Sequence, residues 1–502
     1  MSDEVIPGIA GPPGPPVPLG PPQLSERRGP DPADGEAPRA GASGKESDPA
    51  AGNLNLPRNL LVLSVFVAFA LLFSCNRLPD ERRDVSLATF PSRIRGAERI
   101  RVVIKRYHNV GSVRLSVDGE FQMLTASRPG GRLVKGRKAY RGLRGTNVNV
   151  SGRSVRIGRE TVAPVVWIIP KERNTVRVGG ERLPYGVSFF ARGRNTMAVS
   201  MVLNLEEYLC GVLTAEVPVH EWRDEALKAQ AVASRTYALY KILTRRGAPY
   251  DVDTTIMTMA YRRGGRHTVT VNRAVNATRG LVMAWKGKIF PAKFCSSCGG
   301  HTEDAEGVFF SSRVPPLSAV KCPYCDIKQN PLRASKGWSF VVSEGKVRDA
   351  VKALVRESKV KARVGEIQGI RIVRRGPDRR AVQFRIDHSY EPPLLVQANE
   401  FRLKIGAGIK EMCSTMLDGD GEKKDRIRKV RGGFLFRGRG WGHGVGMCQF
   451  GSQGMAMRGY AYHDILRHYY GAAVELRRLD YAGGGGGSAD PADRADIGPD
   501  AD

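Results

Sequence analysis

The chain has 502 residues, enough for two to four domains of about 100–200 residues each. Its composition is 41% apolar, 7% aromatic and 26% charged, which is globular and excludes collagen, a coiled coil and a polytopic membrane protein. The formal net charge of +29 is uneven, because residues 1–57 and 482–502 are acidic and residues 58–481 hold 74 basic and 37 acidic side chains. Such a basic region attracts polyanions, whether nucleic acid, anionic lipid or an acidic cell-wall glycan.

The N-terminal region contains two segments of different character. Residues 1–57 are rich in Pro, Gly and Ala and have too few apolar side chains to offset the entropy of ordering, which predicts a disordered tail. Leu60–Phe73 is uncharged and shorter than the roughly 20 residues of a spanning helix. A positive flank, this apolar core and a small residue before Cys75 predict an export signal over residues 58–75. It is either a signal peptide that ends in a segment resembling a bacterial lipobox, in which Cys75 would be acylated, or a signal-anchor that is retained. A buried core helix is the alternative.

Residues 99–203 have the pattern of β-strands. Asn147–Ser151 alternates polar and apolar side chains, as a half-buried strand does, and Ile100–Ile104 is rich in β-branched residues. Val155–Ile157 and Thr175–Val178 repeat the pattern at short intervals. The spacing predicts a small β-rich domain without a helix.

The pattern becomes helical after Glu221, where Ala, Leu and Lys recur at a spacing of three to four residues, and this predicts an amphipathic helix. A second helix is expected at Gly345–Glu357, and Ile367–Val373 with Ala381–Ile386 reads as a strand pair around a Gly-Pro turn. The chain should therefore be of the α+β class, with an α+β domain over residues 204–480. The Gly-rich, acidic residues 481–502 predict a disordered tail.

Four of the eight cysteines form two Cys-x-x-Cys pairs. Cys295 with Cys298 and Cys322 with Cys325 have the spacing that lets paired thiolates face one tetrahedral metal ion, and His301 could replace one thiolate. Zinc is expected, because closed thiolate-rich sites favour it. Two disulfides, which an exported protein permits, and a redox pair are the alternatives.

Glu216 is a candidate general acid. It lies between a strand-like run and the predicted helix, flanked by the apolar Ala215 and Val217. Desolvation at such a strand-to-helix junction would raise the pKa of the carboxyl, as a proton donor near neutral pH requires. Without further context, this pattern favours a solvated Glu or a helix-start residue over a catalytic one.

The third candidate is a glycine-dense segment, residues 439–454. Alternate glycines let the backbone approach a ligand closely, while Trp441, His443 and Gln449 supply a stacking face and hydrogen-bonding groups, a combination that suits a sugar. The alternative is a structural turn with a satisfied histidine. A phosphate loop is disfavoured because the Gly-Lys-Ser/Thr ending is missing.

Four segments together, in this order and spacing, resemble the SpoIID/LytB family, named for the stage II sporulation protein D: Asn204–Pro218, Ala226–Tyr237, Cys298–Glu303 and Gly440–Gln449. The resemblance covers roughly residues 99–480. It implies that residues 204–480 are a catalytic domain, with a cleft between it and the β-rich domain.

The resemblance further implies a lytic transglycosylase that cleaves peptidoglycan glycan strands, in the best-known members strands stripped of stem peptides. The family's catalytic Glu corresponds to Glu216. Substrate contacts are implied for residues in the cleft motifs: Lys228, Arg235, Tyr237, Trp441, His443 and Gln449. One departure is Met259-Ala260-Tyr261, where a Gln-x-Tyr motif is expected.

The expected location is outside the cytoplasm, anchored at the cell envelope by a lipid or by the signal-anchor. The expected partners are glycan strands and a wall amidase, because members of the family also include enhancers of wall hydrolases. A passive wall-binding protein is therefore the second hypothesis. A nucleic-acid binder that uses the cysteine pairs and the basic surface is the third, and the predicted export signal argues against it.

Overall fold

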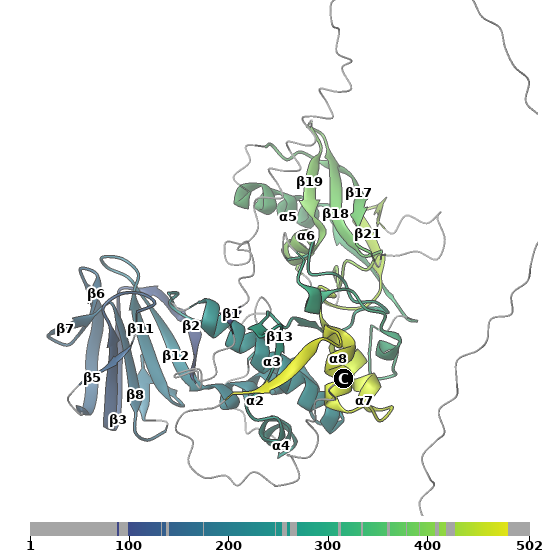
Figure 1. Ribbon diagram of the computed structural model, residues 1–502. Helices are drawn as coiled ribbons and strands as arrows, with labels where there is room; N and C mark the ends of the chain where they lie inside the picture. Colours follow the sequence, from purple (N-terminus) through teal and green to yellow (C-terminus); the bar gives the residue numbers. More distant parts are fainter. Residues whose placement is uncertain are drawn as a thin grey trace, which may run out of the picture. The chain divides into compact units, whose positions relative to one another are not determined.

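The computed structural model describes residues 88–89 and 99–479 (Figure 1), except residues 132, 137–139, 174, 246, 254–258, 262–268, 310–312, 333–334, 359–361, 378, 391, 407–410 and 418–426. The predicted tails, the predicted export segment Leu60–Phe73 and Cys75 lie outside these residues. Seven helices and mostly antiparallel strands make up the described part, which confirms the α+β class. None of the helices described is long and apolar enough to cross a membrane.

Residues 99–204 form a single eleven-stranded sheet, with the order β2-β12-β11-β8-β3-β5-β6-β7 and with β4, β9 and β10 paired beside this path. Side chains alternate between buried and exposed along β3, as the sequence pattern predicts for half-buried strands. The described residues in this range form no helix. The strands are β2 (Arg99–Val110), β3 (Ser112–Ala126), β4 (Val134–Lys135), β5 (Tyr140–Ser151), β6 (Ser154–Ile157), β7 (Glu160–Ala163), β8 (Val165–Pro170), β9 (Val176–Val178), β10 (Glu181–Leu183), β11 (Gly186–Ala191) and β12 (Met197–Asn204).

Three helices follow the sheet: α2 (Leu205–Glu216), α3 (Asp224–Thr244) and α4 (Val269–Ala277). Helix α2 begins directly after β12, where the side chain of Asn204 accepts a hydrogen bond from the Glu206 backbone and caps the helix. The predicted helix after Glu221 is α3, but it is not amphipathic, since every residue from 229 to 239 is buried. A helix buried on all sides is a core element, and small alanines at 3–4 spacing allow neighbouring helices to pack closely around it.

Several strands and helices outside the large sheet pack together although they are far apart in sequence. Strands β1 (Ala88–Thr89), β13 (Leu281–Trp285), β14 (Lys288–Ile289) and β23 (Val474–Arg478) form one sheet, and β15 (Phe294–Cys295) pairs in parallel with β22 (Met447–Cys448). Two 3-10 turns, η1 (Pro315–Leu317) and η2 (Pro323–Cys325), and two helices, α7 (Gln449–Ala456) and α8 (Tyr462–Tyr470), complete this region.

Residues 332–439, which follow η2 and precede β22 in the chain, form a second packing unit. The unit has two three-stranded sheets and the predicted second helix, which is α5, and the predicted strand pair is β17 with β18. Its buried apolar side chains form a cluster separate from the one shared by the large sheet and helices α2 and α3. The elements are β16 (Trp338–Ser343), α5 (Glu344–Glu357), β17 (Ile367–Arg375), β18 (Ala381–His388), β19 (Leu394–Gln397), α6 (Ala398–Ile405), β20 (Ile427–Val430) and β21 (Gly433–Gly438).

Candidate functional site

Glu216 is the last residue of helix α2. The strand-to-helix junction predicted from the sequence is therefore wrong in one respect, because the run before Glu216 is helical. The half-buried carboxyl accepts a hydrogen bond from the backbone N–H of Ala260 at 2.5 Å and one from Nε2 of Gln449 at 3.4 Å. Two segments that are remote in sequence thus meet at this carboxyl.

Burial is the largest influence on the Glu216 carboxyl, and it raises the pKa of this group above its ordinary value. The hydrogen bonds from Ala260 and Gln449 stabilise the carboxylate and partly offset this rise. A carboxyl in this state can be protonated at a higher pH than a solvated one, as a general acid requires. The desolvation expected from the sequence is present, although its structural origin is a helix end.

Two tyrosines accompany Glu216. Tyr208 lies two turns earlier on helix α2, and burial raises its pKa well above the ordinary value, with smaller contributions from Tyr237 and Glu216. The hydroxyl groups of Tyr208 and Tyr237 are buried and have no hydrogen-bond partner among the residues that the structure describes. Buried polar groups are normally paired, so these two hydroxyls are exceptions among the described residues.

The segment that departs from the expected Gln-x-Tyr motif still reaches the site. Met259 is buried, Ala260 supplies its backbone N–H to Glu216, and Tyr261 stacks on Tyr208 with ring centroids 5.2 Å apart. The contact to the carboxyl is made by the backbone, so it does not depend on the side chain at residue 259.

Residues 440–448, the glycine loop, bring Gln449 to Glu216. Four of the glycines have positive φ, and at Gly444 (φ +84°) a Cβ would overlap the guanidinium of the buried Arg380. At Gly446 (φ +73°) a Cβ would overlap the carbonyl of Lys293. The glycines therefore serve close packing under the loop, in addition to any approach of a ligand.

His443 is held by the backbone around it. Its Nδ1 accepts the N–H of Val445 at 3.0 Å, the ring also hydrogen bonds to the backbone of Phe294, and its edge packs on Phe309 with centroids 4.9 Å apart. Burial lowers the pKa of the imidazole well below its ordinary value, and Lys293 and other positive charges lower it further. His443 is therefore a neutral, well-anchored group near pH 7.

Lys293 is a residue that the sequence patterns did not single out. It is 7% exposed, and its ammonium lies 4.3 Å from the ring centroid of Phe309 and 5.1 Å from that of Tyr237. A cation over two ring faces is stabilised by their quadrupoles, more strongly when desolvated. No sequence signal separates this lysine from the others, since its position depends on the pairing of β15 with β22.

Two of the predicted substrate contacts serve other roles in the structure. Arg235 is fully buried and pairs with Glu206, with Nη2 2.6 Å from Oε2, so it cannot reach a ligand at the surface. Lys228 is partly exposed and pairs with Glu225 in its own helix at 2.7 Å. Trp441 is half-buried, and its backbone pairs with that of Ser297.

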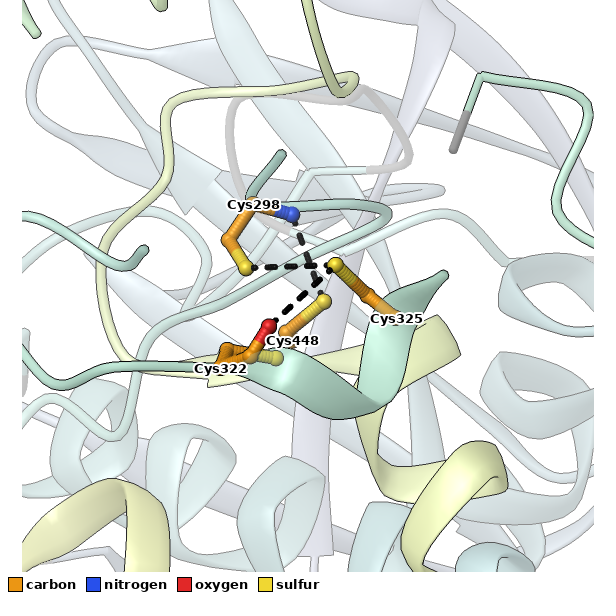
Figure 2. Close-up of side chains that lie close together, drawn as sticks. All are labelled: Cys298, Cys322, Cys325 and Cys448. Atoms are coloured by element: carbon orange, nitrogen blue, oxygen red, sulfur yellow. Dashed lines mark hydrogen bonds between the residues drawn. The ribbon is translucent and has the colours of Figure 1, made fainter. Parts of the chain in front are cut away.

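Four buried cysteines form a compact group, the cysteine cluster, in which all sulfur atoms lie within 4.8 Å of one another (Figure 2): Cys298, Cys322, Cys325 and Cys448. Three of these are predicted ligands, but the fourth is Cys448 in place of Cys295, and His301 is not a member. Cys295 is instead the β-bridge neighbour of Cys448. All seven cysteines that the structure describes are free thiols, so the predicted alternative of two disulfides is not formed.

Comparison with known proteins places these features in a family. Residues 193–285 match the family described as "Stage II sporulation protein", and residues 332–446 match a "Domain of unknown function (DUF8618)". An uncharacterized protein of Brachyspira hyodysenteriae is 34% identical over 59% of this chain and 73% of its own length. Stage II sporulation protein D of Bacillus amyloliquefaciens is 30% identical over 55% of this chain and 75% of its own length.

A third relative, the "Amidase enhancer" of Bacillus subtilis, is 28% identical over 52% of this chain and 39% of its own length. The family match over residues 193–285 includes Glu216 and helix α3. The chain belongs to the SpoIID/LytB family, as its motifs predict.

Proposed function

We propose that the protein is a peptidoglycan lytic transglycosylase in which Glu216 is the catalytic acid and base. The observation that carries the proposal is the half-buried Glu216 carboxyl with a raised pKa, hydrogen bonded to Ala260 and to Gln449 at the end of the glycine loop. Family membership supports the substrate class, because the chain is similar to stage II sporulation protein D and to an amidase enhancer.

In the proposed reaction the protonated Glu216 donates its proton to the glycosidic oxygen that follows N-acetylmuramic acid, and the C1–O bond breaks. The resulting carboxylate then takes the proton from the C6 hydroxyl of the same sugar while this oxygen bonds to C1. The products are a 1,6-anhydro end and a strand with a free hydroxyl, and Glu216 is protonated again. One carboxyl suffices because the nucleophile belongs to the substrate, unlike hydrolysis by two carboxylates.

The proposed substrate contacts are Trp441 for stacking and His443 and Gln449 for hydrogen bonds. Tyr237, which is 2% exposed, would support the site from within the core. Lys228 would take part only after leaving Glu225, and Arg235 would support the site from within the core. The excess of basic residues would attract the lactyl carboxylates of muramic acid. The protein would accordingly act outside the cytoplasm, at the cell envelope.

The test is product analysis on purified, peptide-free glycan strands. Glu216→Gln should abolish the release of anhydro-sugar products, detected by mass spectrometry, while retaining glycan binding in a pull-down. Glu207→Gln, a change on the same helix at a residue that pairs with Arg173 at the surface, is the matched control and should retain activity. Turnover by Glu216→Gln would remove Glu216 from this role.

A folding check accompanies this test. The folded-state pKa of Glu216 is raised, so its contribution to stability is lost as pH rises through that pKa. Glu216→Gln removes this cost and should leave the melting temperature at pH 7 unchanged or higher. A lost activity can then be assigned to the missing carboxyl.

The second candidate function is a wall-binding enhancer of an amidase without turnover of its own. The similarity to the amidase enhancer of Bacillus subtilis favours it. Wild-type protein that binds glycan, releases no anhydro product and increases the rate of an added wall amidase would support this function over the first.

We also propose that the cysteine cluster holds a structural zinc ion. Four buried free thiols within 4.8 Å fit the closed thiolate site that zinc prefers. Such a site leaves no position open for a catalytic water, so no step of the proposed reaction passes through it.

A further inference from the structure

The cysteine cluster has the dimensions of a four-thiolate zinc site. Zinc–sulfur distances of about 2.3 Å in a tetrahedron separate neighbouring sulfur atoms by about 3.8 Å. The sulfur atoms of Cys298 and Cys325 are 3.7 Å apart, and all four lie within 4.8 Å. Figure 2 shows the four side chains converging, with Cys322 and Cys325 on one turn and Cys298 and Cys448 on other segments of the chain.

The polar surroundings of the cluster suit thiolates. The backbone N–H groups of Cys298 and Gly451 point at the sulfur of Cys448, at 3.2 and 3.3 Å, and the hydroxyl of Tyr469 lies 3.0 Å from the sulfur of Cys322. Donors aimed at the ligand atoms from outside the first coordination shell orient ligands and stabilise their negative charge. A buried apolar thiol would not need them.

Cys448 differs from the other three members in what it is attached to. It ends the glycine loop, and its sulfur accepts the N–H of Gly451 and thereby caps helix α7. The next residue is Gln449, whose amide reaches Glu216. A ligand at residue 448 therefore fixes the start of the helix that carries this amide.

Helix α7 is also packed tightly against the other ligands. A Cβ at Gly451 would overlap the sulfur of Cys322 and the hydroxyl of Tyr469, and one at Gly454 would overlap the carbonyl of Tyr324. Gln453, one turn after Gln449, accepts the N–H of Arg223 at 2.9 Å at the start of α3. The helix thus connects the cysteine cluster directly to the segment after Glu216.

We propose that the cysteine cluster binds one zinc ion through all four thiolates, with Cys448 and not Cys295 as the fourth ligand, and that the ion thereby holds Gln449 against Glu216. The second part rests on the proposed function, since it concerns the same carboxyl. The ion would act as a clasp between the glycine loop and the residues around Cys298 and η2.

Zinc content of the full-length protein tests the ligand set. Wild type purified in reductant without added metal should contain one zinc per chain by elemental mass spectrometry. Cys448→Ser should lose most of it, and Cys295→Ser, the same change at the bridge partner of Cys448, should retain it. Retention in Cys448→Ser, or loss in Cys295→Ser alone, would overturn the assignment.

Cys448→His decides the assignment if Cys448→Ser does not fold. A histidine keeps a ligand at this place, so X-ray absorption should show three sulfurs and one nitrogen around zinc. The same spectrum from Cys295→His should still show four sulfurs. Four sulfurs in Cys448→His would exclude Cys448 as a ligand.

Hydrogen exchange of the wild type tests the clasp. Removal of zinc by a chelator should accelerate exchange in peptides that cover residues 443–456 by at least tenfold, and readded zinc should restore protection. Unchanged exchange in these peptides would refute the clasp. Zinc-loaded wild type that releases no anhydro product would instead refute the proposed function, and it would leave the zinc site in place.

Discussion

The buried pair between Arg235 and Glu206 provides a direct test of how the core around α2 and α3 is held. Arg235→Met removes a guanidinium that contacts both carboxylate oxygens of Glu206, at 2.9 and 2.6 Å, and that also donates to the carbonyls of Val275 and Leu281. The change leaves an acidic side chain that is 5% exposed without its buried counter-charge.

The expected loss of stability is large for this reason. Breaking a buried ion pair by removing one partner typically costs about 3–5 kcal/mol, because the remaining charge stays desolvated. The double variant Glu206→Leu/Arg235→Met removes both charges and should recover most of this loss. Lys228→Met removes a cation that is 25% exposed from a pair with Glu225 and should cost at most about 1 kcal/mol.

Urea unfolding followed by circular dichroism measures these differences in the free energy of unfolding. The pair of single variants also separates two roles, because a substrate contact would change glycan binding without changing the unfolding midpoint. An Arg235→Met variant as stable as the wild type would refute a structural role for Arg235. The same conclusion would follow if Arg235→Met lost no more free energy of unfolding than the double variant and Lys228→Met.

Two further predictions concern the site. Anhydro-product release should fall as pH rises through the raised pKa of Glu216, and Gln449→Leu, by removing a hydrogen bond to the carboxylate, should move this falling limb to higher pH by up to about one unit. An unmoved limb would show that Gln449 does not stabilise the carboxylate. Gly444→Ala should cost about 1–3 kcal/mol, because its methyl group meets Arg380, while Gly459→Ala, at φ +86° with open space, should cost less. Thermal unfolding compares the two, and equal losses would remove Arg380 from the explanation.

The local elements were predictable because they depend on neighbours in sequence. Alternation of side chains indicated the strands between residues 99 and 203, and helical spacing indicated α3 and α5. The four family motifs could also be read directly, since each is a short contiguous segment. Helix α2 was missed, because the run before Glu216 is apolar on most sides and short apolar runs do not distinguish a strand from a buried helix.

The candidate site could be named from the sequence only in part. Glu216 and Gln449 were both singled out, but their contact joins residues 233 positions apart and is a property of the packed chain. Arg235 shows a second limit of prediction from sequence. The motif that contains it does not distinguish a residue that lines a cleft from one in a buried ion pair. That distinction depends on which helices surround α3.

The cysteines illustrate the same division. Spacing along the chain identified Cys322 and Cys325 together, because a Cys-x-x-Cys turn can bring its own thiols together. It also identified Cys298, but it paired this residue with Cys295, which is not a member of the cluster. Whether Cys295 or Cys448 completes the group depends on the parallel pairing of β15 with β22, which places these two cysteines side by side and directs only one of them into the cluster. Neighbouring residues are constrained by the covalent chain, whereas Cys448, 123 residues after Cys325, joins the cluster only when the strands and helices between them have packed.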